Sequence, residues 1–104
     1  MYIDGRLRTA DVGLLYDPSR SSERRFCDRW KRSLHQIAPE LRVRRNYPYL
    51  GKSDGFTTHL RRTIGSPRYL GIELEVNQRV LRTEETQRFL AKVISDSLHE
   101  ALRP

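Results

Sequence analysis

Four polar side chains late in the chain have the types and the spacing that hydrolysis needs. They sit at every second position and alternate with the apolar residues Leu70, Ile72, Leu74 and Val76: Glu73, Glu75, Asn77 and Arg79. A period of two places alternate residues on opposite faces of a strand, roughly 6.5–7 Å apart along each face. Carboxylates there could take a proton from water, while an amide and a guanidinium bind substrate. The same pattern is typical of a sheet face in solvent, so alternation alone leaves both interpretations open.

The segment before this strand has the composition of a binding loop. Residues 46–55 contain two tyrosines and an asparagine, and they interrupt the strand pattern of residues 41–45. Pro48, Gly51 and the sequence Ser53-Asp54-Gly55 indicate turns. Because loops at strand ends carry binding residues more often than other segments do, this loop is predicted to contact a ligand.

Several ordered motifs resemble one enzyme family. Asn-x-Pro-Tyr-x-Gly begins at Asn46, Asp-Gly follows at 54–55, Thr-Thr-x-Leu-Arg begins at Thr57, and Gly-Ile-Glu-Leu-Glu-Val-Asn begins at Gly71. Together they look like the C-terminal half of the N-formylglutamate amidohydrolases, and residues 5–18 also resemble the segment that precedes the loop there. The resemblance covers residues 5–81 at least. It implies a zinc-dependent hydrolase of the N-acyl bond on a small acidic amino acid, with a fold similar to the zinc carboxypeptidases.

The resemblance also implies roles for individual residues. Glu75 matches the glutamate of the family's Glu-x-Asn motif and is the predicted general base, with Glu73 as the competing choice because it shares the face. Asn46 and Tyr49 are predicted to line the substrate pocket. Asn77 is predicted to orient Glu75 or to bind substrate.

A substrate carboxylate needs a cation, and the motif at residues 57–61 ends in one. Arg61 is the predicted carboxylate clamp, because a guanidinium can bind a carboxylate through two hydrogen bonds. Arg62 is its neighbour and the second choice. An arginine that faces solvent remains an alternative at either position.

The histidines do not have the spacing of a zinc site. A zinc site needs about three ligands from histidine, cysteine and carboxylates, whereas His35, His59 and His99 are isolated along the chain. The family's zinc ligands lie in its N-terminal half, so no metal ligand is predicted within this chain. We therefore expect residues 1–104 to form a single domain that is the C-terminal part of a longer hydrolase domain, inactive alone.

The elements that would position these residues alternate between strands and helices. Strands are predicted at 10–16, 41–45 and 69–76, with helices at 21–38 (capped by Ser21 or Ser22 and ended by Pro39), at 57–64 and after Thr83. The order β-α-β-(short α)-β-α predicts an α/β fold with some parallel pairing. With the resemblance, this implies a partial three-layer sandwich, the C-terminal part of a zinc-carboxypeptidase-like (phosphorylase/hydrolase-like) fold.

Composition supports two further function classes. The net charge is +7 and the pI is about 10.2, which favours contact with polyanions. No known nucleic-acid motif accompanies the arginines, so a nucleic-acid-binding module is only the alternative. A protein-interaction module is another, with an exposed sheet edge that pairs with another chain or with a second copy.

The single cysteine and the hydropathy indicate the compartment. Cys27 cannot form an internal disulfide, and it is predicted to be a buried thiol in the helix at 21–38. There is no run of 18 apolar residues and no apolar leader. A cytoplasmic protein with no membrane contact is the prediction.

Overall fold

The computed structural model describes residues 2–3, 6–7, 10–47, 55–64 and 69–104. The elements follow one another as β1 (Tyr2–Ile3), β2 (Arg6–Leu7), β3 (Val12–Leu15), α1 (Ser21–Ile37), β4 (Val43–Arg45), α2 (Gly55–Ile64), β5 (Glu73–Val76), the 3-10 helix η2 (Gln78–Leu81) and α3 (Glu84–Ala101). From β3 onward, the order of strands and α-helices is the predicted one. The β1–β2 pair and η2 were not predicted.

The sheet behind the candidate site is mixed. Its order is β4-β3-β5, with β3 parallel to β4 and antiparallel to β5, while β1 and β2 pair separately. Helix α1 is the crossover between the two parallel strands. The α/β class is therefore confirmed, although each strand of this sheet is shorter than the sequence predicted, and β5 begins at Glu73 instead of residue 69.

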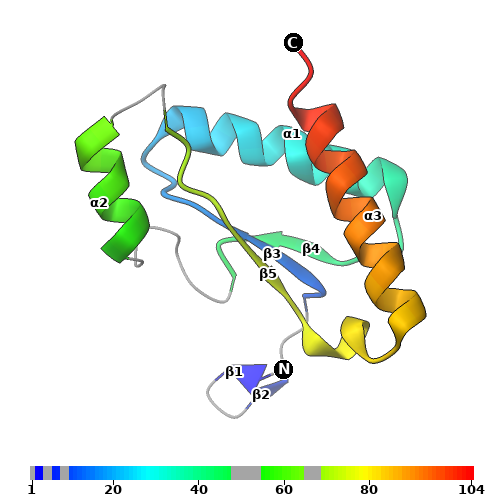
Figure 1. The fold of residues 1–104 in the computed structure, drawn as a ribbon. Coiled ribbons are helices and arrows are strands. Elements are labelled where there is room, and N and C mark those ends of the chain that lie inside the picture. Colours follow the sequence, from blue (N-terminus) through cyan, green and yellow to red (C-terminus); the bar gives the residue numbers. More distant parts are fainter. Residues whose placement is uncertain (1, 4–5, 8–9, 48–54, 65–68) are drawn as a thin grey trace.

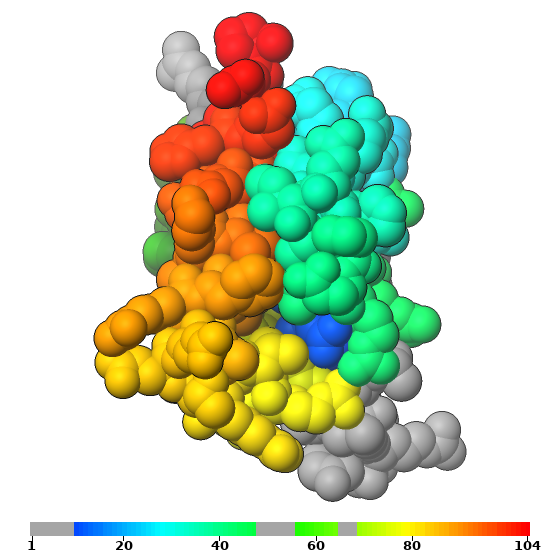
Figure 2. All heavy atoms as spheres, turned by 90° about the vertical axis from the view of Figure 1, so that its right-hand side faces the viewer, coloured from blue at the N-terminus to red at the C-terminus, as the bar shows by residue number. Residues whose placement is uncertain are grey.

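Helices α1 and α3 lie on the same face of this sheet (Figure 1). Between them and the sheet is the core, where the alternate strand residues Val12 and Leu14 have no exposed surface. Trp30 packs edge to face on Phe26 at 6.0 Å and donates its indole N–H to Ser97 of α3 at 2.9 Å. Seen from the side, only a small blue part of the chain around the start of β3 shows between the yellow segment near η2 and the blue-green segment around the end of α1 (Figure 2).

The spacing of the apolar residues at positions 26, 30, 34 and 37 predicts an apolar stripe on helix α1. The structure confirms most of this stripe but not the predicted cap. Phe26, Trp30 and Leu34 are buried, whereas Ile37 is 41% exposed. The N-cap residue is Arg20, which makes no side-chain capping bond, so the prediction that Ser21 or Ser22 caps the helix is wrong. Both serines lie inside the first turn, because the turn at 17–20 already leads the chain into the helix.

Helix α3 begins as predicted. The Thr83 side chain accepts from the Thr86 backbone N–H, and the Thr86 hydroxyl contacts Thr83 in return, which satisfies two backbone groups at the helix start. Leu90, Val93 and Ala101 of the predicted stripe are buried. Phe89 and Leu102, which the predicted stripe also includes, are exposed, so the prediction is wrong for these two residues.

Helix α2 turns its polar side toward the protein body. The sequence predicts Thr57 or Thr58 as its cap, but the helix begins at Gly55, so both threonines lie inside it and this prediction is wrong. Thr57 and Arg61 are buried. Phe56 and Ile64 are 70% and 45% exposed. None of the described helices, α2 included, has the length and the apolar composition to cross a bilayer.

Candidate functional site

Glu73 and Glu75 lie on the face of the sheet that α1 and α3 do not cover. Val12 pairs with Val76 and Leu14 with Leu74, and these four residues belong to the core under the helices. The residues between them therefore point to the opposite face, where Glu75 lies across from Gly13 and Glu73 across from Leu15. Both carboxylates are half-buried. The prediction that they share one face is confirmed.

Gly13 lets the chain after β4 cross this face next to Glu75. A Cβ atom on Gly13 would lie 2.5 Å from the Tyr47 backbone carbonyl oxygen and 3.8 Å from the Glu75 Cβ. No side chain fits at the first distance without a shift of the backbone. The missing side chain therefore brings the start of the predicted binding loop beside the predicted base.

Arg44 is a second cation candidate that sequence reasoning missed. It pairs with Gly13 in the parallel register, so it lies on the same face as Glu75. Its guanidinium carbon stands 4.9 Å from the centre of the Tyr47 ring, a cation–π contact. The feature of the sequence that could have pointed to this region is Gly13, since an isolated glycine within a strand often marks a close backbone approach.

Asn46 joins the carboxyl ends of the two parallel strands. Its backbone N–H donates to the Leu14 carbonyl at 2.9 Å, and its side-chain carbonyl accepts from the Tyr16 N–H, also at 2.9 Å. Its φ of 52° is left-handed, a conformation that asparagine tolerates better than most residues. Asn46 therefore fixes the start of the loop.

A hollow of about 380 Å³ opens at this end of β4. It is lined by Arg44, Asn46 and Tyr47 together with Tyr16, Lys31 and Arg45. Burial raises the pKa of Tyr16, against the opposing effect of the nearby Arg45 charge, so its phenol stays neutral. The hollow is cationic and lies at the carboxyl ends of parallel strands, where open α/β sheets commonly bind ligands.

Asn77 and Arg79 do not continue the alternation of the strand. The strand ends at Val76, and Asn77 is 2% exposed as the N-cap of η2. The Asn77 amide donates to the Ala10 carbonyl at 3.1 Å, and its oxygen accepts from the Arg79 N–H at 3.0 Å. Arg79 pairs with Asp11 at 3.8 Å. The substrate contact of Asn77 stays a prediction, and it would require these bonds to break.

Arg61 is buried against an internal carboxylate. Its Nε and one terminal nitrogen donate to the two oxygens of Glu23 at 2.8 and 3.0 Å, and the same terminal nitrogen donates to the Gly71 carbonyl at 2.7 Å. Glu23 also accepts from the backbone N–H groups of Gly71 and Asp17 at 3.0 Å each. A substrate role for Arg61 stays a prediction. It would require a substrate carboxylate to replace Glu23 as the partner of the guanidinium.

Two predicted parts of the site, Tyr49 and the zinc ion, cannot be placed among the described residues. Tyr49 lies outside the described residues. Within the described ranges, no group of three or more histidine, cysteine, aspartate or glutamate side chains could hold a metal, and His35, His59 and His99 are each exposed. The described residues therefore do not fit the zinc ion that the resemblance implies.

Comparison with known proteins gives one structural likeness. No family model matches the chain, and no curated protein matches it. The crystal structure of gene product Atu2144 from Agrobacterium tumefaciens matches with a TM-score of 0.70 and 27% sequence identity. The match covers 97% of this chain but 37% of that one. The chain therefore spans well under half the length of the structure that it resembles.

Proposed function

We propose that the chain supplies the base and the substrate-binding residues of a hydrolase similar to the N-formylglutamate amidohydrolases. The observation that carries the proposal is the position of Glu75. It lies on the helix-free face of the sheet, beside Gly13 and the crossing segment that starts at Asn46. The start of one resembling motif, at residues 46–47, thus lies near Glu75 of another, although about 30 residues separate Asn46 from Glu75 along the chain.

Glu75 is the proposed general base. Its carboxylate would accept a proton from water as the water oxygen attacks the acyl carbon, and would then donate that proton to the leaving amide nitrogen as the C–N bond breaks. Formate and the free amino acid would leave. The zinc ion that the family resemblance implies would be held outside the described residues, and the role of Glu75 is proposed without it.

Arg44 and Asn46 are the residues we propose to hold the carboxylate of the substrate. Both line the cationic hollow, and Arg44 lies on the same face as Glu75. Arg61 is less suited, because its buried guanidinium already binds Glu23, and a substrate carboxylate would have to displace that ion pair. The proposed carboxylate clamp is therefore Arg44 at the end of β4, in place of Arg61 on α2.

The test is formate release from N-formyl-L-glutamate by the complete in-frame polypeptide that contains residues 1–104. Glu75→Gln should lower kcat by about 10²- to 10⁴-fold, the usual contribution of a general base. Glu84→Gln is the matched control, since Glu84 lies on the surface of α3, where it pairs with Arg88. Arg44→Ala should raise KM more than it lowers kcat, while Arg62→Ala should change neither.

Three results would count against the proposal. If the complete polypeptide hydrolyses no N-acyl acidic amino acid, the function is wrong. If Glu73→Gln lowers kcat more than Glu75→Gln does, the base assignment is wrong. If Arg61→Lys raises KM and Arg44→Ala does not, the clamp lies on α2 after all.

The nucleic-acid alternative gains no support from the arginines. Many of them already pair with carboxylates, which reduces the positive charge that a phosphate backbone could use. Among the residues that the structure describes, arginine ion pairs join Arg20 and Arg61 to Glu23, Arg42 and Arg79 to Asp11, Arg45 to Asp28, Arg88 to Glu84, and Arg103 to Glu100.

A further inference from the structure

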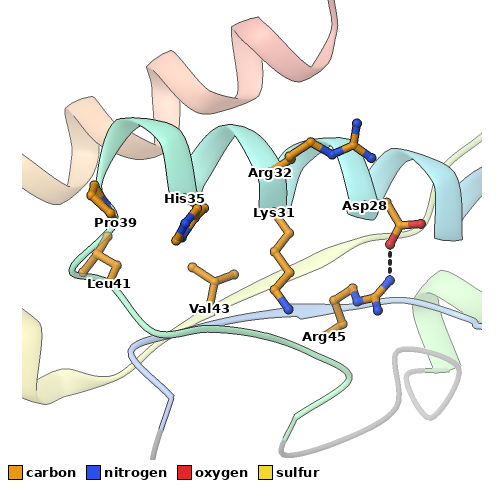
Figure 3. Close-up of a pocket in the computed structure, with 8 residues that line it drawn as sticks. All are labelled: Asp28, Lys31, Arg32, His35, Pro39, Leu41, Val43 and Arg45. Carbon is orange, nitrogen blue, oxygen red and sulfur yellow. Dashed lines mark hydrogen bonds and ion pairs between the residues drawn. The ribbon is translucent and has the colours of Figure 1, made fainter.

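A second hollow lies between α1 and the outer strand of the sheet. It measures about 550 Å³ and is lined by Asp28, Lys31, Arg32, His35, Pro39, Leu41, Val43 and Arg45. Lys31 and His35 extend from α1 toward β4, Val43 points up toward them, and the Asp28–Arg45 ion pair closes one end (Figure 3). Leu41, Val43 and Pro39 make its floor apolar, so the groove exposes core-type surface at the edge of the sheet.

The backbone of β4 also presents an unpaired edge to this groove. In the sheet, β4 has β3 on one side and no strand on the other among the described residues. On either side of β4, the Arg42 carbonyl accepts from the Val12 N–H and the Asn46 N–H donates to the Leu14 carbonyl, so the even-numbered positions face β3. Because backbone direction alternates along a strand, the N–H and C=O groups of Val43 and Arg45 point outward. Another extended segment could pair with them.

The charge around the groove indicates which kind of extended segment could bind beside β4. Lys31, Arg32 and Arg45 are cationic, and the one carboxylate, Asp28, already pairs with Arg45. A second copy of this chain is a poor occupant, because antiparallel pairing of two Val-Arg-Arg strands would bring arginines of the two copies together, and like charges across a strand pair are destabilising. The groove therefore has the charge complement of an acidic segment.

We propose that β4 and this groove dock an extended acidic segment of another polypeptide, which adds to the sheet as a further strand. Its main chain would bind the outward groups of Val43 and Arg45. Apolar side chains on its inner side would cover Val43 and Leu41, and carboxylates flanking them would meet Lys31 and Arg32. Main-chain bonds would supply affinity, and the side chains would supply the choice of partner. The groove shares Lys31 and Arg45 with the hollow at the end of β4, but peptide binding is measured without hydrolysis, so the two proposals are tested separately.

The first experiment measures peptide binding by fluorescence anisotropy with the whole chain. The probe is a labelled peptide of about seven residues, the length of an ordinary strand, with Glu, Val, Val and Glu at odd positions and Thr at even positions. The matched peptide has Lys in place of both Glu. We expect the Lys peptide to bind at least about tenfold more weakly, since like charges at an interface disfavour the wrong partner.

A backbone test separates strand addition from simple charge attraction. Two versions of the Glu peptide carry N-methyl groups, one at odd and one at even positions. An added strand turns only one of these two sets of N–H groups toward β4. One version should therefore lose binding and the other should keep it.

Charge reversal on the protein completes the test. The Lys31→Glu/Arg32→Glu variant should bind the Lys peptide more tightly than the Glu peptide, whereas Lys92→Glu on α3 should leave the order unchanged. The proposal is overturned if the Glu and Lys peptides bind equally or if both N-methylated versions bind alike. It is also overturned if sedimentation shows a dimer that Val43→Glu abolishes, because the edge would then belong to a second copy.

Discussion

The two halves of α1 are held in place by different forces. The first half is anchored through Glu23, a carboxylate with no exposed surface that binds Arg61 and two backbone N–H groups. The second half is anchored by Trp30 and Leu34, which pack in the core shared with α3. An apolar contact tolerates imperfect geometry, whereas a buried ion pair depends on every partner. The first half is therefore the more sensitive one.

The largest expected effect comes from removing the charge of Glu23. Glu23→Gln leaves the Arg61 guanidinium buried without its counterion, which typically lowers the free energy of unfolding by about 3–5 kcal/mol. Urea denaturation measures it. Glu84→Gln, which breaks an exposed pair on α3, is the control and should change it by less than about 0.5 kcal/mol.

A double variant sharpens the contrast between the two halves. Glu23→Met combined with Arg61→Met removes both charges, and it should be more stable than Glu23→Gln alone, since the most deeply buried cation goes with its counterion and only the partly exposed Arg20 loses its carboxylate. If Glu23→Gln unfolds at the same urea concentration as the parent chain, the ion pair does not anchor α1 and the comparison fails.

A somewhat smaller effect is expected in the apolar half. Leu34 has no exposed surface, so Leu34→Ala should lower the free energy of unfolding by about 2–5 kcal/mol, through lost transfer energy and a cavity. Ile37→Ala on the same helix is the control, because Ile37 is 41% exposed. Equal losses for the two variants in urea denaturation would show that Leu34 is not part of a packed core.

The smallest effect concerns Cys27, which lies between Glu23 and Trp30 on α1. Burial, and then the neighbouring charges of Glu23 and Asp28, raise the pKa of the thiol from 9.0 to about 12. The unfolded chain loses this proton near pH 9 while the folded chain keeps it. Stability is thus unaffected below pH 9 and falls as the pH rises from 9 toward 12, by at most about 1.4 kcal/mol per pH unit.

The measurement is the free energy of unfolding between pH 8 and 11 for the parent chain and for Cys27→Ala. The parent curve should fall more steeply above pH 9. Tyr16 also has a raised pKa, but it is present in both proteins, so the difference isolates Cys27. Parallel curves would mean that the thiol does not stay protonated in the folded chain.

What the sequence predicts well is what repeats along an element. The spacing of Phe26, Trp30 and Leu34 predicts the buried side of α1, and the alternation through Glu73 and Glu75 predicts their common face. The Thr83 cap was also predictable, because its partners lie within one helical turn. In each case the deciding interaction is local or periodic.

What the sequence does not predict depends on contacts between distant segments. From the sequence, Glu23 is an acidic residue in the first turn of a helix, yet its main partner, Arg61, is 38 positions away. Asn77 fitted the period of the strand, but its side chain instead bonds to Ala10, 67 positions away. Neither contact leaves a repeating pattern, so the sequence predicts a clamp role for Arg61 and a substrate role for Asn77 without any sign of these internal bonds.

The antiparallel pairing of β3 with β5 has a consequence for the order of folding. Strand β3, α1 and β4 follow one another closely, so they can associate while the chain is still being synthesised. Strand β5 pairs with β3 through Val76 and Val12, so one side of the central strand stays unpaired by β5 until residue 76 has left the ribosome. Closing a loop of that length slows folding, and β3 is open to incorrect partners during that interval.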